Sequence, residues 1–336
     1  MAHLKIVSLL PSATEIVHIL GLTEYLVGRS HECDYPPEVA SLPACTEPKF
    51  DPTGSSAEIH DRVTEILQSA LSVYQVKTDV LQNLQPTHIL TQAKCEVCAV
   101  SLSDVEAAVQ SLTGINPKIL SLQSNKLAGL WNDIRAVSEA LGEASDPTRA
   151  ESAIAELQAR VQHYQELTEQ VLHKPSVVCI EWPDPLMSAG NWVPELVTLA
   201  GGMPMLSQAG EESPWITWKD LVMTDPEVII LMPCGYDIEQ TVKESQVLLN
   251  DPHWPLLRAV KTKQVYVADG NQYFNRPGPR LIDSIEILTE ILHPKLAKTQ
   301  HHKGNGWKLL TDCLDRPMPS TPVPPSRSSQ IIQSLS

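Results

Sequence analysis

The residues best suited to chemistry lie in the stretch "TQAKCEVCAVS", which contains a Cys-x-x-Cys pair, Cys95 and Cys98. Such a pair can be a redox couple, half of a metal site, or two small side chains that line a pocket. A redox couple needs the low thiol pKa that the first turn of a helix provides. Here the next helix is predicted to begin near Ser103, downstream of both thiols, so dithiol chemistry is the least favoured of the three interpretations.

A second loop, "HECDYPP", carries His31 and Cys33. Because both loops follow neighbouring predicted strands, His31, Cys33, Cys95 and Cys98 can meet, and this set of side chains is acceptable for tetrahedral zinc. However, His-x-Cys is not a zinc-knuckle spacing, and the chain has no second Cys-x-x-Cys. Two interpretations therefore stay open, a zinc site and the mouth of a pocket lined by neutral side chains.

Aromatic residues make up only 5% of the chain, but many of them collect in segments that directly follow predicted strands. In such loops they suit stacking on a large flat ligand, although they could also cap the ends of two small cores. These residues are Tyr35, Trp182, Trp192, Tyr236, Tyr273 and Phe274.

Carboxylates also follow predicted strands, among them Glu181 and Asp269, which could hold ligand amides or hydroxyl groups. The common catalytic templates are missing, because the sequence has no G-x-S-x-G, no P-loop and no G-x-G-x-x-G after its first strand. We therefore expect a binding protein rather than an enzyme.

The elements that position these loops alternate between short apolar strands and amphipathic helices, as is typical of an α/β chain with mostly parallel sheets. Ligands of such sheets bind beyond the carboxyl ends of the strands. After the first strand, Ser12 and Glu15 stand in the register of a helix capping box. Strands are expected at residues 4–10, 24–30, 87–92, 118–122, 176–182, 227–233 and 264–269.

Residues 148–172 are predicted to form one long polar-faced helix without a strand on either side, which suits a rigid connector between two lobes. We therefore expect an N-terminal α/β lobe (1–145), a connecting helix (146–174), a C-terminal α/β lobe (175–295) and a tail (296–336). The tail is rich in proline and serine, so we expect it to be disordered.

The composition argues against some classes of binding partner and indicates a cellular compartment. The 336 residues carry a formal net charge of −15 and no long Lys/Arg-rich run, which argues against nucleic acid and anionic membranes as partners. Seven cysteines do not suggest a secreted disulfide framework. Pro11 breaks the N-terminal apolar run, and no stretch is long enough for a membrane helix, so we expect a cytoplasmic protein without membrane insertion.

Several of these motifs together resemble the class III substrate-binding proteins of ABC importers, and within that group the vitamin B12-binding and iron-chelate-binding proteins. The resemblance runs from about residue 4 to 294 and is carried by "KIVSLLPSATEIVHILGL", "LVGRSHECDYPPEV" and "FNRPGPRLIDSIEIL". It implies two Rossmann-like lobes with a cobalamin-type corrinoid bound between them and only small closure on binding. "CEVCAVS" and "HECDYPP" look like a cytosolic branch of cobalamin-binding proteins.

The resemblance assigns expected roles to the loop residues. The corrin faces would contact Trp182, Trp192, Tyr236 and Phe274, with Tyr35, Tyr273, Ser12 and Glu181 nearby. The amides of the corrin rim would contact Asp269, Asn271, Asn275 and Arg276. The cobalt could take His31, Cys33, Cys95 or Cys98 as an axial ligand.

Importer-bound members of the family dock on a permease through one acidic residue on each lobe. Glu58 suits the first position, whereas the second region places Lys219 or Asp220 there, so carriage or sensing of the ligand inside the cell fits better than docking. The alternatives are another metal chelate, haem or a siderophore, and a thiol- or zinc-dependent enzyme that uses Cys95 and Cys98. A siderophore would need more arginine than Arg29, Arg276 and Arg280 provide.

Overall fold

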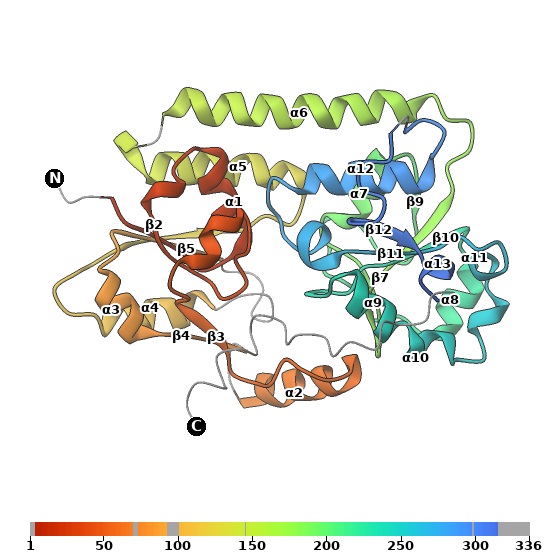
Figure 1. Ribbon diagram of the computed structural model, residues 1–336, viewed down its shortest axis with the longest axis horizontal. Helices are drawn as coiled ribbons and strands as arrows, with labels where there is room; N and C mark the ends of the chain where they lie inside the picture. The colour runs from red at the N-terminus through yellow and green to blue at the C-terminus, as the bar shows by residue number, and fades with distance from the viewer. Residues whose placement is uncertain (1–3, 70–72, 93–100, 145, 298, 315–336) are drawn as a thin grey trace.

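Two α/β lobes lie side by side beneath one long helix in the computed structural model of the chain (Figure 1). The structure describes residues 4–69, 73–92, 101–144, 146–297 and 299–314. The expected fold class is confirmed, because both lobes contain a parallel sheet covered by helices.

The N-terminal lobe is built on a four-stranded parallel sheet in the order β2-β1-β5-β6. Both faces of the sheet are buried: Ile6 on β1 joins the core beneath α1 and α5, and Val7 joins the core beneath α3 and α4. The continuous apolar strands of the sequence follow from this two-sided burial. The elements are β1 (Ile6–Ser8), α1 (Pro11–Ile19), β2 (Leu26–Arg29), α3 (Thr78–Leu84), β5 (His88–Gln92), α4 (Leu102–Gln110), β6 (Lys118–Leu122) and α5 (Leu127–Ala140).

An excursion between β2 and α3 extends the N-terminal lobe toward the other lobe (Figure 1). It contains the antiparallel pair β3 (Thr46–Pro48) and β4 (Tyr74–Val76), with α2 (Ser56–Ser69) between them. The Ser56 amide of α2 donates to Glu244 of the C-terminal lobe over 2.8 Å, so this excursion touches both lobes.

The C-terminal lobe has a mixed sheet in the order β12-β11-β10-β7-β8, with β9 also paired to β7. Strands β7, β9, β10 and β11 are parallel, and β8 and β12 run antiparallel to their neighbours. The strands are β7 (Ser176–Pro183), β8 (Leu186–Ser188), β9 (Met203–Pro204), β10 (Val228–Leu231), β11 (Val265–Ala268) and β12 (Trp307–Leu309). The helices are α7 (Val193–Leu199), α8 (Trp218–Thr224), α9 (Ile238–Glu244), α10 (Gln246–Leu249), α11 (Arg258–Lys261), α12 (Leu281–Leu292) and α13 (Leu310–Leu314).

The connecting helix α6 (Pro147–Glu169) spans both lobes (Figure 1). It begins with Pro147, and the Asp146 side chain accepts a hydrogen bond from the Thr148 amide, which is a standard N-terminal cap. It packs on α5 of the first lobe and on α7 and α12 of the second. Arg160 of α6 forms ion pairs with Asp283 and Glu286 of α12, at 2.6 and 2.7 Å.

Helix α4 begins at Leu102, close to the predicted start near Ser103, and the Ser101 side chain accepts from the Asp104 amide. Two local predictions were wrong. Ser12 does not cap α1, because Pro11 occupies the first turn and Leu10 is the N-cap residue. Disorder from residue 296 is wrong for residues 299–314, because β12 extends the sheet. Across the described ranges, we find no helix with the length and apolar character needed to cross a bilayer.

Candidate functional site

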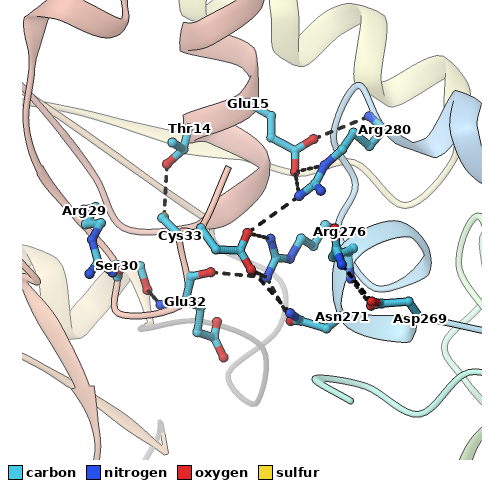
Figure 2. A network of polar contacts seen from close by, with 12 residues as sticks. Thr14, Glu15, Arg29, Ser30, Glu32, Cys33, Asp269, Asn271, Arg276 and Arg280 are labelled. Atoms are coloured by element: carbon cyan, nitrogen blue, oxygen red, sulfur yellow. Dashed lines mark hydrogen bonds and ion pairs between the residues drawn. The ribbon is translucent and has the colours of Figure 1, made fainter. Parts of the chain in front are cut away.

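Two arginines of the C-terminal lobe bind two carboxylates of the N-terminal lobe (Figure 2). Arg276, only 6% exposed, donates to both carboxylate oxygens of Asp34, with Nη2 3.0 Å from Oδ2. Arg280 donates to the buried carboxylate of Glu15 through Nη2 and Nε, at 2.7 and 3.0 Å. We call these four residues the ion-pair latch. Both ion pairs contain charge-assisted hydrogen bonds, and both join one lobe to the other.

The backbone around Gly278 explains how the latch residues come so close to α1. A Cβ atom at Gly278 would lie 2.9 Å from Glu15 Oε2 and 3.2 Å from the Cα atom of Ser12, so a larger side chain would push this turn away from α1. The turn that contains Gly278 therefore covers Ser12, which is buried. The Arg280 guanidinium also lies 4.4 Å from the centroid of the Tyr35 ring, which occupies one face of Tyr35 in a cation–π contact.

The loop after β2 places a neutral imidazole and a buried carboxyl group beside the latch. His31 Nδ1 is 2.8 Å from Thr46 Oγ1, and its ring packs on Tyr74 at a centroid distance of 5.1 Å. Burial, with the charges of Arg29 and Lys77, lowers the pKa of His31 to about 4. The Tyr74 hydroxyl donates to Glu32 over 3.1 Å, and burial raises the pKa of Glu32.

The structure places Cys33 in the core of the N-terminal lobe, and its role as a metal ligand stays a prediction. Its side chain is buried in the core and accepts a hydrogen bond from the Thr14 hydroxyl at 3.0 Å (Figure 2). Burial raises the pKa of the thiol to about 12. Cys95 and Cys98 lie outside the described residues. Within the ranges that the structure describes, no group of three or more His, Cys, Asp and Glu side chains could hold a metal ion.

The carboxyl ends of β7 and β10 bring three predicted residues together. The rings of Trp182 and Tyr236 lie side by side at a centroid distance of 5.4 Å. The Glu181 carboxylate accepts a hydrogen bond from the Ser213 hydroxyl, and burial raises the pKa of Glu181. We call Glu181, Trp182 and Tyr236 the strand-end face.

The two aromatic residues of the segment after β11 differ in burial, since Phe274 is fully buried and Tyr273 is partly exposed. Phe274 is 0% exposed and belongs to the core, so the expectation that it stacks on a ligand does not hold. The Trp192 indole donates to the Phe274 carbonyl over 2.7 Å and braces this segment. Tyr273 packs at the edge of the same core and meets the His302 ring at 5.7 Å.

The polar residues of this segment also serve the fold. Asp269 accepts two hydrogen bonds from Gln272, each 2.8 Å, and thereby caps the turn of residues Gly270–Phe274. Asn275 donates to the Met232 and Gly270 carbonyls at 3.2 and 2.9 Å. Asn271 accepts from Arg276 at 2.8 Å and so orients a latch residue.

Sequence reasoning missed Glu15, Glu32, Asp34 and Tyr74 as members of the site. Glu32 and Asp34 lie within "HECDYPP", and their position between His31 and Tyr35 was a usable signal. Tyr74 gave no signal, because the β3–β4 pair was not predicted. Glu15 was predicted as a capping residue, and its partner Arg280 is 265 positions away in the sequence.

The two acids considered for permease docking occupy matching positions. The Glu58 side chain accepts from the amide and hydroxyl of Ser55 at the start of α2. The Asp220 side chain accepts from the amide and hydroxyl of Thr217 at the start of α8. Both carboxylates are exposed, and each belongs to a different lobe. Asp220, rather than Lys219, is therefore the counterpart of Glu58.

A hollow of about 530 Å³ lies at the amino ends of the C-terminal strands, lined in part by Pro175, Val228 and Gln264. It is at the wrong end of the sheet for a ligand of an α/β fold. Its charged groups also pair with one another, since Glu227 contacts His173 at 3.0 Å and Arg258 at 3.5 Å. The strand-end face and the latch, which lie between the lobes, remain the candidate site.

Known proteins share this architecture. The chain is 24% identical over 297 residues to the uncharacterized ABC transporter substrate-binding lipoprotein YvrC of Bacillus subtilis, covering 88% of this chain and 81% of that protein. It is 22% identical over 303 residues to a vitamin B12-binding protein of Vibrio cholerae, covering 88% and 91% of the two chains. The solved periplasmic haem-binding protein RhuT of Roseiflexus sp. RS-1 superposes with a TM-score of 0.64 at 20% identity, covering 88% of this chain and 100% of that chain.

A family model described as "Periplasmic binding protein" matches residues 6–271. Together with these relatives, the match confirms the resemblance to class III proteins of the vitamin B12 and iron-chelate type, while membership of a cytosolic branch stays a prediction. The chain belongs to the periplasmic binding protein family.

Proposed function

We propose that this protein binds a cobalamin-type corrinoid, without catalysis, between its two lobes. The vitamin B12-binding relative and the haem-binding structural neighbour support a large metal chelate as the ligand. The choice between these two ligands rests on the charge of the candidate site.

The observation that carries the choice is that the arginines between the lobes are already neutralised. Arg276 is paired with Asp34, and Arg280 is paired with Glu15. Arg29 donates to four backbone carbonyl groups of its own lobe. Haem carries two propionates that need cationic partners, whereas the rim of a corrin carries uncharged amides. The paired arginines therefore favour the corrin.

The carboxyl groups of Glu32 and Glu181 point the same way. Each accepts one hydrogen bond from a protein hydroxyl group, of Tyr74 and Ser213 respectively, and neither supplies a positive charge that could pair with a propionate. Carboxyl groups in such surroundings can instead accept hydrogen bonds from ligand amides. This surface suits an amide-rimmed ligand better than one with carboxylates.

Binding of a corrinoid requires the lobes to separate from the arrangement described above. A cavity of only about 20 Å³ lies between them, lined by Ser12, Gln92, Asp133 and Pro277 among others. This space suits a single water molecule. The ion-pair latch crosses the same interface, so we expect it to open when the ligand enters. Each arginine is then released together with one carboxylate, so the open cleft gains no net positive charge.

Parallel titrations with hydroxocobalamin and with haemin, followed by their visible spectra, test this proposal. We expect saturable binding of hydroxocobalamin and binding of haemin that is weaker by at least tenfold. The Asp34→Asn variant removes one counter-charge of Arg276 and should narrow this preference, whereas Asp220→Asn, an exposed acid outside the cleft, should not. Preferential binding of haemin by the wild-type protein would overturn the choice of ligand.

We place this activity in the cytoplasm as part of the same proposal. Among the described residues, Cys33, Cys45, Cys179 and Cys234 are free thiols, which supports a reducing compartment. Cell fractionation with an antibody against the native protein tests this placement; recovery from a secreted or membrane-anchored fraction would contradict it.

Transport-linked delivery is the second candidate function. The matched exposed acids Glu58 and Asp220, one on each lobe, favour it. A Glu58→Lys, Asp220→Lys double variant distinguishes the two candidates, because it should abolish delivery to a permease and leave ligand affinity unchanged.

A further inference from the structure

Two buried hydrogen-bond donors on the strand-end face have no acceptor. Trp182 Nε1 and Tyr236 Oη are both shielded from solvent, and among the described residues neither has a hydrogen-bond partner. The Tyr236 side chain as a whole is only 8% exposed. A buried polar group without a partner destabilises a fold by about 1–3 kcal/mol, so two neighbouring examples need an explanation.

The backbone holds both donors in fixed positions. Trp182 lies on β7, where it pairs with Met187 of β8. Tyr236 lies in the turn after β10, where its amide donates to the Pro233 carbonyl at 3.2 Å and its carbonyl accepts from the Asn271 amide at 3.1 Å. The two rings also contact each other at a centroid distance of 5.4 Å, so they lie side by side without the missing hydrogen bonds. The donors are thus positioned before any acceptor arrives, which is how a binding site is preorganised.

We propose that Trp182 and Tyr236 form a two-donor subsite that binds an oxygen acceptor of the ligand. This inference rests on the proposed corrinoid function and deepens it, because it replaces stacking by hydrogen bonding as the role of the two rings. A corrinoid offers two kinds of acceptor, the amide carbonyl groups of its rim and the phosphate of its nucleotide loop.

The chemistry of Tyr236 fits a donor. Burial, with the nearby Glu244 and Cys234, raises the pKa of Tyr236, so the hydroxyl keeps its proton at any physiological pH. An indole N–H can only donate. The subsite therefore offers two donors, of which the Trp182 indole can pair only with an acceptor.

The Tyr236→Phe variant tests the subsite through two measured quantities, thermal stability and ligand affinity, on which opposite effects are expected. Removing an unpaired buried hydroxyl should leave the thermal stability of the ligand-free protein unchanged or raise it. The same change should weaken the affinity for hydroxocobalamin about five- to tenfold, because one hydrogen bond to the ligand is lost. Trp182→Phe should likewise weaken binding, with its folding checked by thermal unfolding.

Tyr266→Phe is a matched control. Tyr266 is also 8% exposed, but its hydroxyl donates to Gln264 Oε1 over 2.8 Å. Its removal should lower the stability of the ligand-free protein and leave the affinity unchanged. This pattern is the reverse of the one expected for Tyr236.

Dicyanocobinamide, which keeps the rim amides but lacks the nucleotide loop, identifies the acceptor. An equal loss of affinity for both corrinoids in Tyr236→Phe indicates a rim carbonyl, and a loss confined to cobalamin indicates the phosphate. Wild-type affinity in both Tyr236→Phe and Trp182→Phe would overturn the subsite alone. Failure of the wild-type protein to bind either corrinoid would overturn the proposed function together with it.

Discussion

Two regions between the lobes differ in how completely their polar groups are paired. In the ion-pair latch, Arg276 and Arg280 are each matched by a carboxylate of the opposite lobe. On the strand-end face, Trp182 and Tyr236 leave two buried donors unmatched. In the first arrangement each buried charge has a partner, whereas in the second two donors are desolvated without an acceptor. We therefore assign the latch to joining the lobes and the strand-end face to the ligand.

The largest loss of stability is expected when the Glu15–Arg280 ion pair, the more buried pair of the latch, is broken. Arg280→Met leaves the Glu15 carboxylate, 2% exposed, without its partner. Removing one member of a buried ion pair costs about 3–5 kcal/mol, because the other charge stays desolvated. We expect a loss of this size in the free energy of unfolding, measured by urea denaturation.

The double variant Glu15→Leu, Arg280→Met is the control for this experiment. Removing both charges should recover most of the lost stability, because no uncompensated charge remains. Equal stabilities of the single and double variants would show that Arg280 acts through its contact with Tyr35 rather than through Glu15.

The next-largest effect is a loss of stability in acid, caused by the partly buried imidazole of His31. Its folded-state pKa, about 4, lies below the ordinary value near 6.5, so the unfolded chain takes up the proton first. The stability that this group contributes is complete above about pH 6.5 and is lost as the pH falls toward 4. The loss should be on the order of 2 kcal/mol.

His31→Asn should flatten this part of the stability curve, measured by urea denaturation between pH 7 and 4. His163→Asn, an exposed position on α6, is the matched control and should keep the wild-type slope. A wild-type slope in His31→Asn would show that another group causes the acid sensitivity.

A smaller change of stability with pH, in the opposite direction, is expected from His302, which is hydrogen-bonded to Glu286. Burial opposes protonation, but the hydrogen bond to Glu286 at 3.1 Å and the charges of Glu290 and Asp283 outweigh it and raise the pKa of His302. The stabilisation is therefore complete below about pH 6.5 and is lost as the pH rises through the raised pKa. We expect less than about 1 kcal/mol, since the pair is partly solvated.

Comparison of His302→Gln with the wild-type protein at pH 6 and pH 9 measures this contribution. The variant should be the less stable protein at pH 6 and should match the wild-type protein at pH 9. A constant difference between the two proteins at both pH values would assign His302 a packing role instead.

The sequence predicted those features that depend on neighbouring residues. The strand positions, the helix α6 and the gathering of His31, Glu181, Trp182 and Tyr236 at strand ends all follow from local periodicity and from the α/β arrangement. The partners of the latch did not follow, because Glu15 and Arg280 are joined only by the folded topology.

Composition alone could not distinguish aromatic residues that face the core from those that face a ligand. Phe274 follows β11 and Trp182 lies near the carboxyl end of β7, yet the Phe274 side chain turns into the core, while the Trp182 indole nitrogen has no partner among the described residues. The strand β12 was missed because its short sequence, Trp307–Leu309, follows a polar stretch and is stabilised mainly by its place on the sheet edge.

Amide hydrogen exchange with and without hydroxocobalamin tests the contrast between the two regions most directly. We predict that the corrinoid slows exchange at the strand ends, in residues 181–183 and 233–237, and leaves the hollow near residues 171–175 and 258–264 unchanged. Protection of that hollow without protection of the strand ends, or no change anywhere at saturating corrinoid, would contradict the assignment of the strand-end face to the ligand.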